Sequence, residues 1–214
     1  MDERTNRLMN MFGDTLALSD QIHTEESDED ETYDRLRTRL ARWNMAIENV
    51  AWLASIDMGD VKGRWDGEIQ VHRLVKACLG ARLWMILEKH LRLDTDLEEA
   101  TVKGNPDLMK LIFQNLLDNA IKYTDRGGHI EVSVRKEANH VKVVFQDDGC
   151  GIPENILPNI FQRYSQYGDD PDTMGLGLGL AVVKEGTEVF GGTADVSSIE
   201  GKGSIITVWF PLDL

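Results

Sequence analysis

Four short blocks between residues 115 and 204 constrain this chain more than any other feature. They read QNLLDNAIKYT (114–124), DDGCGIP (147–153), GLGLGL (175–180) and GKGS (201–204). Glycine lets the main chain approach a ligand or another segment more closely than a side chain would allow. Blocks of this kind, separated by apolar segments, predict a ligand site built largely from main-chain groups.

The first block places Asn115, Asn119 and Lys122 at offsets of four and seven residues, which return to nearly the same face of a helix. Leu116, Leu117 and Ile121 point elsewhere. Amide oxygens can coordinate a hard cation such as magnesium, and a lysine can meet a phosphate as a point charge. Taken alone, the same pattern also fits an ordinary solvated helix face.

The second and third blocks follow a strand and open a helix. Asp147, at the end of an apolar strand, can accept a hydrogen bond from an exocyclic amine such as that of adenine. Gly175, Gly177 and Gly179 free the backbone to curl around phosphates at a helix N-terminus, where unpaired N–H groups attract anions. No GxxxxGK[ST] motif occurs, and the β-α-β setting of a dinucleotide fold is missing. For the second and fourth blocks, ordinary turns are the competing interpretation.

Charge and cysteine usage narrow the function classes. The formal net charge of -14 argues against a nucleic-acid partner or an anionic membrane surface. An anionic nucleotide would therefore need backbone N–H groups, a few cations and a metal. Cys78 and Cys150 form no CxxC pair, which argues against zinc and predicts reduced thiols in a cytoplasmic protein. No apolar run approaches the roughly 20 residues of a membrane helix.

The hydrophobic patterns predict an α+β fold. Helices are expected over 72–91, 105–123 and 180–190, and strands over 68–71, 129–135, 141–146, 194–198 and 204–210. Asn105 followed by Pro106 is a typical helix start. We predict helices on one side of a mixed, mostly antiparallel sheet, which is a two-layer α/β sandwich.

The first part of the chain predicts an antiparallel helical hairpin. Residues 24–31 (TEESDEDE) are too acidic to be buried and are expected to form an exposed turn, and the second helix is expected to end at Gly59. Its apolar residues alternate in steps of three and four, which favours a four-helix bundle in a homodimer through residues 1–58. They are Tyr33, Leu36, Leu40, Trp43, Ile47, Val50 and Ala54. Packing of the hairpin on the rest of its own chain is the alternative.

In their order and spacing, the blocks resemble the catalytic, ATP-binding domain of sensor histidine kinases in the GHKL superfamily. QNLLDNAIKYT looks like the N box, the three other blocks look like the glycine boxes, and IFQRYSQ (160–166) looks like the F box. The resemblance covers about residues 68–212. It divides the chain into a dimerisation hairpin (1–62) and a catalytic domain (63–214).

The resemblance implies roles for particular residues. Asn119 becomes the magnesium ligand and Asn115 a second N-box contact, while Lys122 and Tyr123 face the phosphates and ribose. Asp147 binds the adenine amine, and residues from 153 to about 174 form a mobile lid anchored by Phe161. The other ATP-site residues that it implies are Gly149, Gly151, Ile152, Arg163, Gly175, Gly177, Leu178, Gly179, Leu180 and Ser204.

One position separates the branches of the superfamily. Gyrase, chaperone and mismatch-repair relatives have a catalytic glutamate four residues before the metal-binding asparagine. Here that residue is Asn115, and a neutral amide cannot act as a general base. The resemblance therefore implies transfer of the γ-phosphoryl group to a histidine, and then to a response regulator, in preference to hydrolysis.

The histidine that should accept the phosphate is not found. The family motif H-E/D-x-x-T/N-P-L aligns only weakly with residues 2–8, which places Asp2 at the acceptor position. Two explanations stay open. Either the sequence starts at or past the acceptor of a longer protein, which can be membrane-anchored, or the protein lacks one. In the second case it either phosphorylates another chain or serves as a pseudokinase or ATP-sensing scaffold that regulates a partner.

Overall fold

The computed structural model describes residues 29–59, 67–165 and 176–212, with the side chains of the first helix described from Trp43 onward. That helix, α2 (Glu29–Asp57), is followed by the short strand β1 (Gly67–Gln70) and by α3 (Val71–Glu88). Next come β2 (Arg92–Leu97), β3 (Thr101–Gly104) and α4 (Pro106–Tyr123). The chain continues through β4 (His129–Glu137), β5 (His140–Asp147), a 3-10 turn η2 (Leu157–Asn159), α5 (Gly179–Val189), β6 (Thr193–Ile199) and β7 (Gly203–Pro211).

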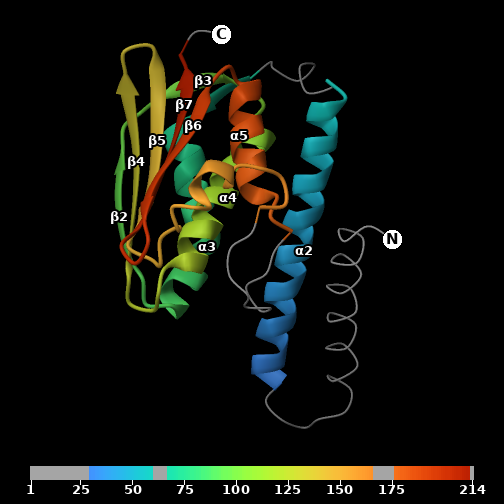
Figure 1. Cartoon of the computed structure of the whole chain (residues 1–214), viewed down its shortest axis with the longest axis vertical. Coiled ribbons are helices and arrows are strands. Elements are labelled where there is room, and N and C mark those ends of the chain that lie inside the picture. The colour runs from blue at the N-terminus through green and yellow to red at the C-terminus, as the bar shows by residue number, and fades with distance from the viewer. Residues whose placement is uncertain (1–28, 60–66, 166–175, 213–214) are drawn as a thin grey trace.

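Five strands form the main sheet in the order β2-β4-β5-β7-β6. β2 runs parallel to β4, and the other neighbours are antiparallel. β1 and β3 form a separate two-stranded antiparallel sheet. Helices α3, α4 and α5 cover one side of the main sheet (Figure 1), so the predicted two-layer α+β sandwich is confirmed.

The core lies between the sheet and α4. Strand residues at alternate positions point inward, and the apolar face of α4 meets them, as the period of each element requires. Phe210 stacks edge-on against Phe113 of α4 with ring centroids 6.0 Å apart and against Phe190 at 5.4 Å. All three rings are fully buried. This dry contact fixes the rotation of α4 about its axis, and so it decides which polar residues of the helix face away from the sheet.

Helix α2 lies beside α4 and α5, on the side of these helices away from the sheet (Figure 1). Its Ala46 and Leu53 pack with Leu111 of α4 and Val182 of α5. Two residues of the predicted seam are on another face: Ile47 is 58% exposed and Val50 44% exposed, whereas Trp43 of the same seam is buried. The described part of the hairpin therefore packs on its own chain while part of the predicted seam stays open.

Several predicted elements need correction. The acidic turn predicted over 24–31 ends too late, because residues 29–31 already belong to α2. Residues 24–28 and Asp2 lie outside the described residues. Strands β2 and β3 were not predicted from the sequence. In the described part of the chain, no helix is both long enough and apolar enough to cross a membrane.

Candidate functional site

Helix α4 carries the first block of polar residues. It begins as predicted: the side-chain oxygen of Asn105 accepts hydrogen bonds from the N–H groups of Asp107 (2.9 Å) and Leu108 (3.1 Å). Because the apolar face of α4 is fixed on the sheet, Asn119 and Lys122 stay partly exposed near the C-terminal end of the helix. This placement agrees with a helix face available to a ligand.

Asn115 differs from this expectation. Its side chain is only 3% exposed and forms a reciprocal amide pair with Asn49 of α2. Asn49 Nδ2 donates to Asn115 Oδ1 at 3.1 Å, and Asn115 Nδ2 donates to Asn49 Oδ1 at 2.9 Å and to the Leu111 carbonyl at 2.9 Å. The prediction that this face of α4 is free to meet a ligand is therefore wrong at Asn115, because α2 covers that residue. Contact between Asn115 and a ligand stays a prediction, and it applies to a conformation in which the hydrogen bonds with Asn49 are broken.

Gly179, at the start of α5, packs against the amide pair that α2 and α4 form. A Cβ atom there would lie 2.6 Å from Asn115 Oδ1. Glycine therefore allows α5 to approach the amide pair. One buried amide is enclosed by α2, α4 and α5 together.

Lys122 and Tyr123 form one unit at the end of α4. Lys122 Nζ donates to the Tyr123 hydroxyl at 2.8 Å and lies 4.4 Å from the centre of the tyrosine ring. Both side chains are partly exposed. The pair presents an ammonium and a hydroxyl, which are groups that can donate to phosphate or ribose oxygens.

Asp147 ends β5, as predicted. Its Oδ1 accepts a hydrogen bond from the Gly149 N–H at 3.0 Å. Burial raises the pKa of Asp147, with the Asp148 charge acting in the same direction, while the backbone hydrogen bonds from Gly149 and Ser204 lower it. Ser204 lies opposite Asp147 in the pairing of β5 and β7. The carboxylate is therefore a half-buried acceptor held by main-chain groups.

The first glycine box is pinned on both sides. The Cys150 N–H donates to the Tyr123 carbonyl at 3.1 Å, and a Cβ atom on Gly149 would lie 2.2 Å from that carbonyl oxygen. On the other side, the Ile152 N–H donates to Ser198 Oγ at 2.8 Å, and this hydroxyl donates to the Gly203 carbonyl at 2.8 Å. The loop that carries Gly149, Gly151 and Ile152 therefore joins α4 to the β6–β7 turn.

The second glycine box faces α2. Leu178 is buried and packs with Ala46 and Leu53 of α2, so its side chain is engaged in packing in this structure. The Gly177 carbonyl accepts from the Tyr164 N–H at 2.7 Å, and Leu180 packs partly buried against the main core. Gly175 lies outside the described residues.

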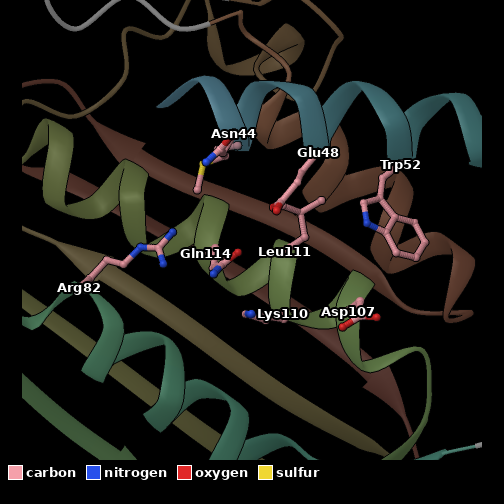
Figure 2. A pocket seen from close by; sticks show the side chains of 9 residues that line it. Asn44, Glu48, Trp52, Arg82, Asp107, Lys110, Leu111 and Gln114 are labelled. Atoms are coloured by element: carbon pink, nitrogen blue, oxygen red, sulfur yellow. The ribbon is translucent and has the colours of Figure 1, made fainter. Parts of the chain in front are cut away.

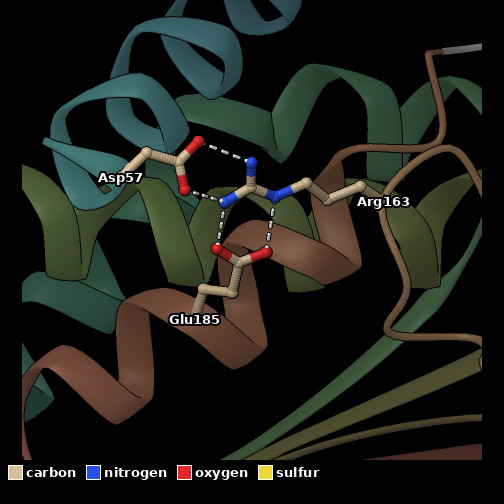
Figure 3. Close-up of polar contacts among 3 residues, drawn as sticks. All are labelled: Asp57, Arg163 and Glu185. Atoms are coloured by element: carbon tan, nitrogen blue, oxygen red, sulfur yellow. Dashed lines mark hydrogen bonds and ion pairs between the residues drawn. The ribbon is translucent and has the colours of Figure 1, made fainter.

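Phe161 and Arg163 occupy the segment after η2. Phe161 packs partly buried against the main core, in keeping with an anchoring role. Arg163 does not have a free guanidinium: it donates to both carboxylate oxygens of Asp57 at 2.8 Å, and to Glu185 through Nε at 2.7 Å and through a second, shorter contact (Figure 3). These contacts raise the pKa of Arg163, with the Glu185 hydrogen bond as the largest cause, and lower the pKa of Asp57. The predicted phosphate contact of Arg163 therefore competes with two carboxylates.

The predicted site residues thus separate into two groups. Asn119, Lys122, Tyr123, Asp147, Gly149, Gly151 and Ile152 gather where α4 and β5 end. Asn115, Arg163 and Leu178 contact α2, and Gly179 packs against Asn115. Sequence reasoning missed three residues with partners that are distant in the chain. Asn49 pairs with Asn115, the Lys89 ammonium donates to carbonyls at the end of α4, and Ser198 accepts the Ile152 N–H. Only Asn49 left a signal, as a polar residue at an inward helical spacing between Ala46 and Leu53.

A groove of about 310 Å³ lies between α2 and the N-terminal half of α4 (Figure 2). Glu48 and Trp52 of α2 face Lys110 and Gln114 of α4 across it, and Arg82 of α3 is held at one end by Asp118 at 2.9 Å. Asn119, Lys122 and Asp147 do not line this groove. It is a feature of the α2 interface and is distinct from the group of residues at the ends of α4 and β5.

Comparisons with known proteins show the family and the fold. A family model described as histidine kinase-, DNA gyrase B-, and HSP90-like ATPase matches residues 104–214. Heme sensor protein HssS of Staphylococcus saprophyticus subsp. saprophyticus is 30% identical over 197 residues, covering 92% of this chain and 41% of that protein. Signal transduction histidine-protein kinase AfsQ2 of Streptomyces coelicolor is 29% identical over 174 residues, covering 80% and 31%. This chain spans less than half the length of either relative.

Solved structures show the same fold. Acinetobacter baumannii histidine kinase AdeS superposes with a TM-score of 0.74 at 18% identity, covering 96% of this chain and 97% of that chain. Full-length ShkA, solved in complex with AMPPNP, gives a TM-score of 0.68 at 18% identity, covering 95% and 45%. At these identities the likeness establishes the fold alone.

Proposed function

Since this chain belongs to the family of histidine kinase-, DNA gyrase B-, and HSP90-like ATPases, we propose that it is the core of a histidine protein kinase in two-component signalling. Membership of the family indicates an ATP-binding domain in residues 104–214. In our proposal the γ-phosphoryl group of ATP passes to a histidine and from there to an aspartate of a response regulator. The name of AfsQ2, a signal transduction histidine-protein kinase, supports this proposal.

The observation that carries the proposal is the way Asp147 is held beside the first glycine box. Its Oδ1 is fixed by the Gly149 N–H, and the half-buried carboxylate is an acceptor for the exocyclic amine of adenine. Gly149 itself packs on the Tyr123 carbonyl, so the adenine contact and the Lys122–Tyr123 pair are parts of one rigid unit. A base site and a phosphate site joined in this way fit ATP.

Asn119 is the residue that we assign to magnesium. Its partly exposed amide offers a neutral oxygen, and Mg²⁺ in nucleotide sites takes few protein ligands and keeps phosphate oxygens and water. The donor chemistry present therefore fits the ion. Magnesium supplies neutralisation of phosphate charge, and Lys122 adds a positive charge from the protein side.

Transfer is favoured over hydrolysis because of Asn115. A GHKL-type ATPase, the third possibility, would need a general base four residues before the metal ligand, and the amide of Asn115 cannot accept the proton of water. In our proposal Asn115 and Arg163 contribute to nucleotide binding only after their contacts with Asn49 and Asp57 are released.

Dimerisation and the domain boundary complete the proposal. We assign residues 1–62 to a dimerisation hairpin and 63–214 to the catalytic domain, with a homodimer formed through residues 1–58. The exposed Ile47 and Val50 on α2 support this assignment, because they lie on the predicted seam and away from α4 and α5.

Incubation with ATP labelled at the γ-phosphate tests the activity. A kinase that modifies its own histidine gives acid-labile, base-stable label on this chain. Label only on an added histidine-bearing partner supports transfer between chains. Steady phosphate release with no protein label would contradict the proposal and favour an ATPase.

Calorimetry with MgATP tests the metal assignment. We expect Asn119→Asp to weaken or alter the magnesium-dependent part of ATP binding, because it replaces the neutral donor by a charged one. Asn139→Asp, in the exposed β4–β5 turn, makes the same chemical change away from the site and is the matched control. Equal MgATP affinity for Asn119→Asp and the parent would exclude Asn119 as the ligand.

The alternative function is an ATP-sensing scaffold or pseudokinase. It is favoured by the contacts of α2, which occupies Asn115 and Arg163 and so couples nucleotide binding to the position of a partner-binding helix. ATP binding without label on this chain or on any added partner would support this alternative.

A further inference from the structure

Lys89 connects the end of α3 to the end of α4. It is the residue that follows α3, and its ammonium donates hydrogen bonds to three main-chain carbonyls at the end of α4. The acceptors are the carbonyls of Ile121 (2.8 Å), Lys122 (3.1 Å) and Thr124 (2.9 Å). An ammonium has three N–H donors, so each donor has one carbonyl.

These three carbonyls are groups that a helix cannot satisfy by itself. The last carbonyls of an α-helix have no partner within the helix, and they form the negative end of its dipole. Lys89 supplies both the donors and the opposite charge. Its own carbonyl accepts from the Gly127 N–H at 2.9 Å, so the residue also holds the turn that follows α4.

The carbonyl that Lys89 leaves out is that of Tyr123. This carbonyl lies between two that are bound by the ammonium, and it accepts the Cys150 N–H of the first glycine box at 3.1 Å. It is also the atom against which Gly149 packs. The direction of the peptide groups on either side of Tyr123 therefore decides how the glycine box sits on α4.

We propose that Lys89 is a positioning residue for the nucleotide site, acting through the end of α4. By holding the carbonyls of Lys122 and Thr124, it sets the Tyr123 carbonyl toward the glycine box. It thereby fixes Asp147 and the Lys122–Tyr123 pair relative to each other. The inference rests on the proposed ATP site, and Lys89 itself contacts no nucleotide in it.

Burial supports this assignment. Partial burial lowers the pKa of Lys89, and the nearby Asp125 opposes that change. An ammonium that gives up hydration while remaining bonded to three carbonyls is held in one place. Lys76 on the same helix is exposed and has none of these contacts, which makes it a matched control.

The test compares Lys89→Met, Lys89→Arg and Lys76→Met in the full chain. We expect Lys89→Met to weaken MgATP binding in calorimetry by roughly fivefold or more, since three hydrogen bonds that orient the site are lost. Lys89→Arg, which keeps the charge and several donors, is expected to recover most of the affinity. Lys76→Met should bind as the parent does.

Hydrogen exchange on the nucleotide-free protein gives a second readout. We expect the Cys150 amide to exchange roughly tenfold faster in Lys89→Met, because its acceptor carbonyl is no longer held. If Lys89→Met does not fold, Lys89→Gln replaces it with a neutral side chain that still donates. A lower melting temperature with parental ATP affinity and parental Cys150 exchange would overturn the inference.

The two readouts also separate this inference from the proposed function. If the parent protein binds no ATP, the proposed function fails, and unchanged exchange at Cys150 would still refute the role of Lys89. If the parent binds ATP and Lys89→Met binds equally well, only the role of Lys89 fails.

Discussion

Helix α4 has two interfaces that hold it in different ways. Toward the sheet it presents Phe113 among fully buried apolar side chains. Toward α2 its contacts include a reciprocal amide pair, Asn115 with Asn49, beside a small apolar cluster. The first contact has no alternative partner in water, whereas amides bond to water or to a ligand nearly as well as to each other. The sheet interface therefore fixes the orientation of α4, whereas the amides on the α2 side have alternative partners in water or in a ligand.

The largest expected effect comes from breaking the dry interface. Phe113→Ala should lower the free energy of unfolding by about 3–5 kcal/mol, because it leaves a cavity between α4 and the sheet. Urea unfolding followed by circular dichroism measures this loss. Leu87→Ala on the exposed side of α3 is the control and should change stability by less than about 0.5 kcal/mol. Similar losses for the two variants would mean that Phe113 does not fill a buried contact on which the stability of α4 depends.

Asp147 lies at the end of β5, between the buried core and the proposed site. Its substitution should therefore affect protein stability and ATP affinity in different ways. Burial raises the pKa of this acid in the folded chain, so its ionised form costs stability above the unfolded pKa. Asp147→Asn should therefore unfold at equal or higher urea concentration at neutral pH. It should also bind ATP roughly tenfold or more weakly, since a hydrogen bond to a charged acceptor is lost.

Asp148→Asn is the neighbouring control for Asp147→Asn. Its carboxylate accepts the His129 N–H at 2.7 Å and is otherwise exposed, so ATP affinity should change little. Unchanged ATP affinity in Asp147→Asn would exclude the assigned adenine contact.

A smaller effect is expected from the amide pair. Asn49→Ala removes two hydrogen bonds but leaves Asn115 free to bind water once α2 separates. The variant should therefore lower the free energy of unfolding by about 1 kcal/mol. Asn49→Ala, Asn115→Ala and the double variant form a cycle that isolates the pair. If the double variant costs the sum of the two single variants, the amides do not interact.

The smallest effect is expected from Asp57, which is exposed and bonds to Arg163. The pKa of Asp57 in the folded chain lies below the ordinary 3.8. The stabilisation that ionised Asp57 provides is therefore present above pH 3.8 and is lost as the pH falls through the lower pKa of the folded chain. Hydrogen exchange of α2 should increase slightly in acid and should lose this dependence in Asp57→Asn. High salt should reduce the contact further. A rise in exchange near neutral pH would point to a different group.

The sequence predicted elements whose signals are local. The Asn105 cap and the strand before Asp147 follow from neighbouring residues, and each lies where it was expected. On the polar face of α4 this holds for Asn119 and Lys122 but not for the buried Asn115. β2 (RLDTDL) was missed because it is a polar edge strand whose order comes from parallel pairing with β4. β3 has only four residues, too few for a period.

The site was harder to predict where it depends on distant contacts. The motif predicted that Asn115 and Arg163 face a ligand, but it carries no information about Asn49 or Asp57, which reach them from another helix. The three carbonyls bound by Lys89 leave no pattern in the chain either. Only packing brings these groups together, so only a structure reveals them.

Helix α2 is a single unbroken helix of 29 residues. At about 1.5 Å per residue it is roughly 44 Å long, and a stiff rod transmits rotation from one end to the other. A turn of roughly 100° about its axis would replace Asn49 opposite Asn115 by Glu48 or Val50, neither of which can form the reciprocal amide pair. The amide pair is therefore sensitive to rotation of α2 about its own axis. Rotation imposed at the far end of the helix would break the pair beside the proposed nucleotide site.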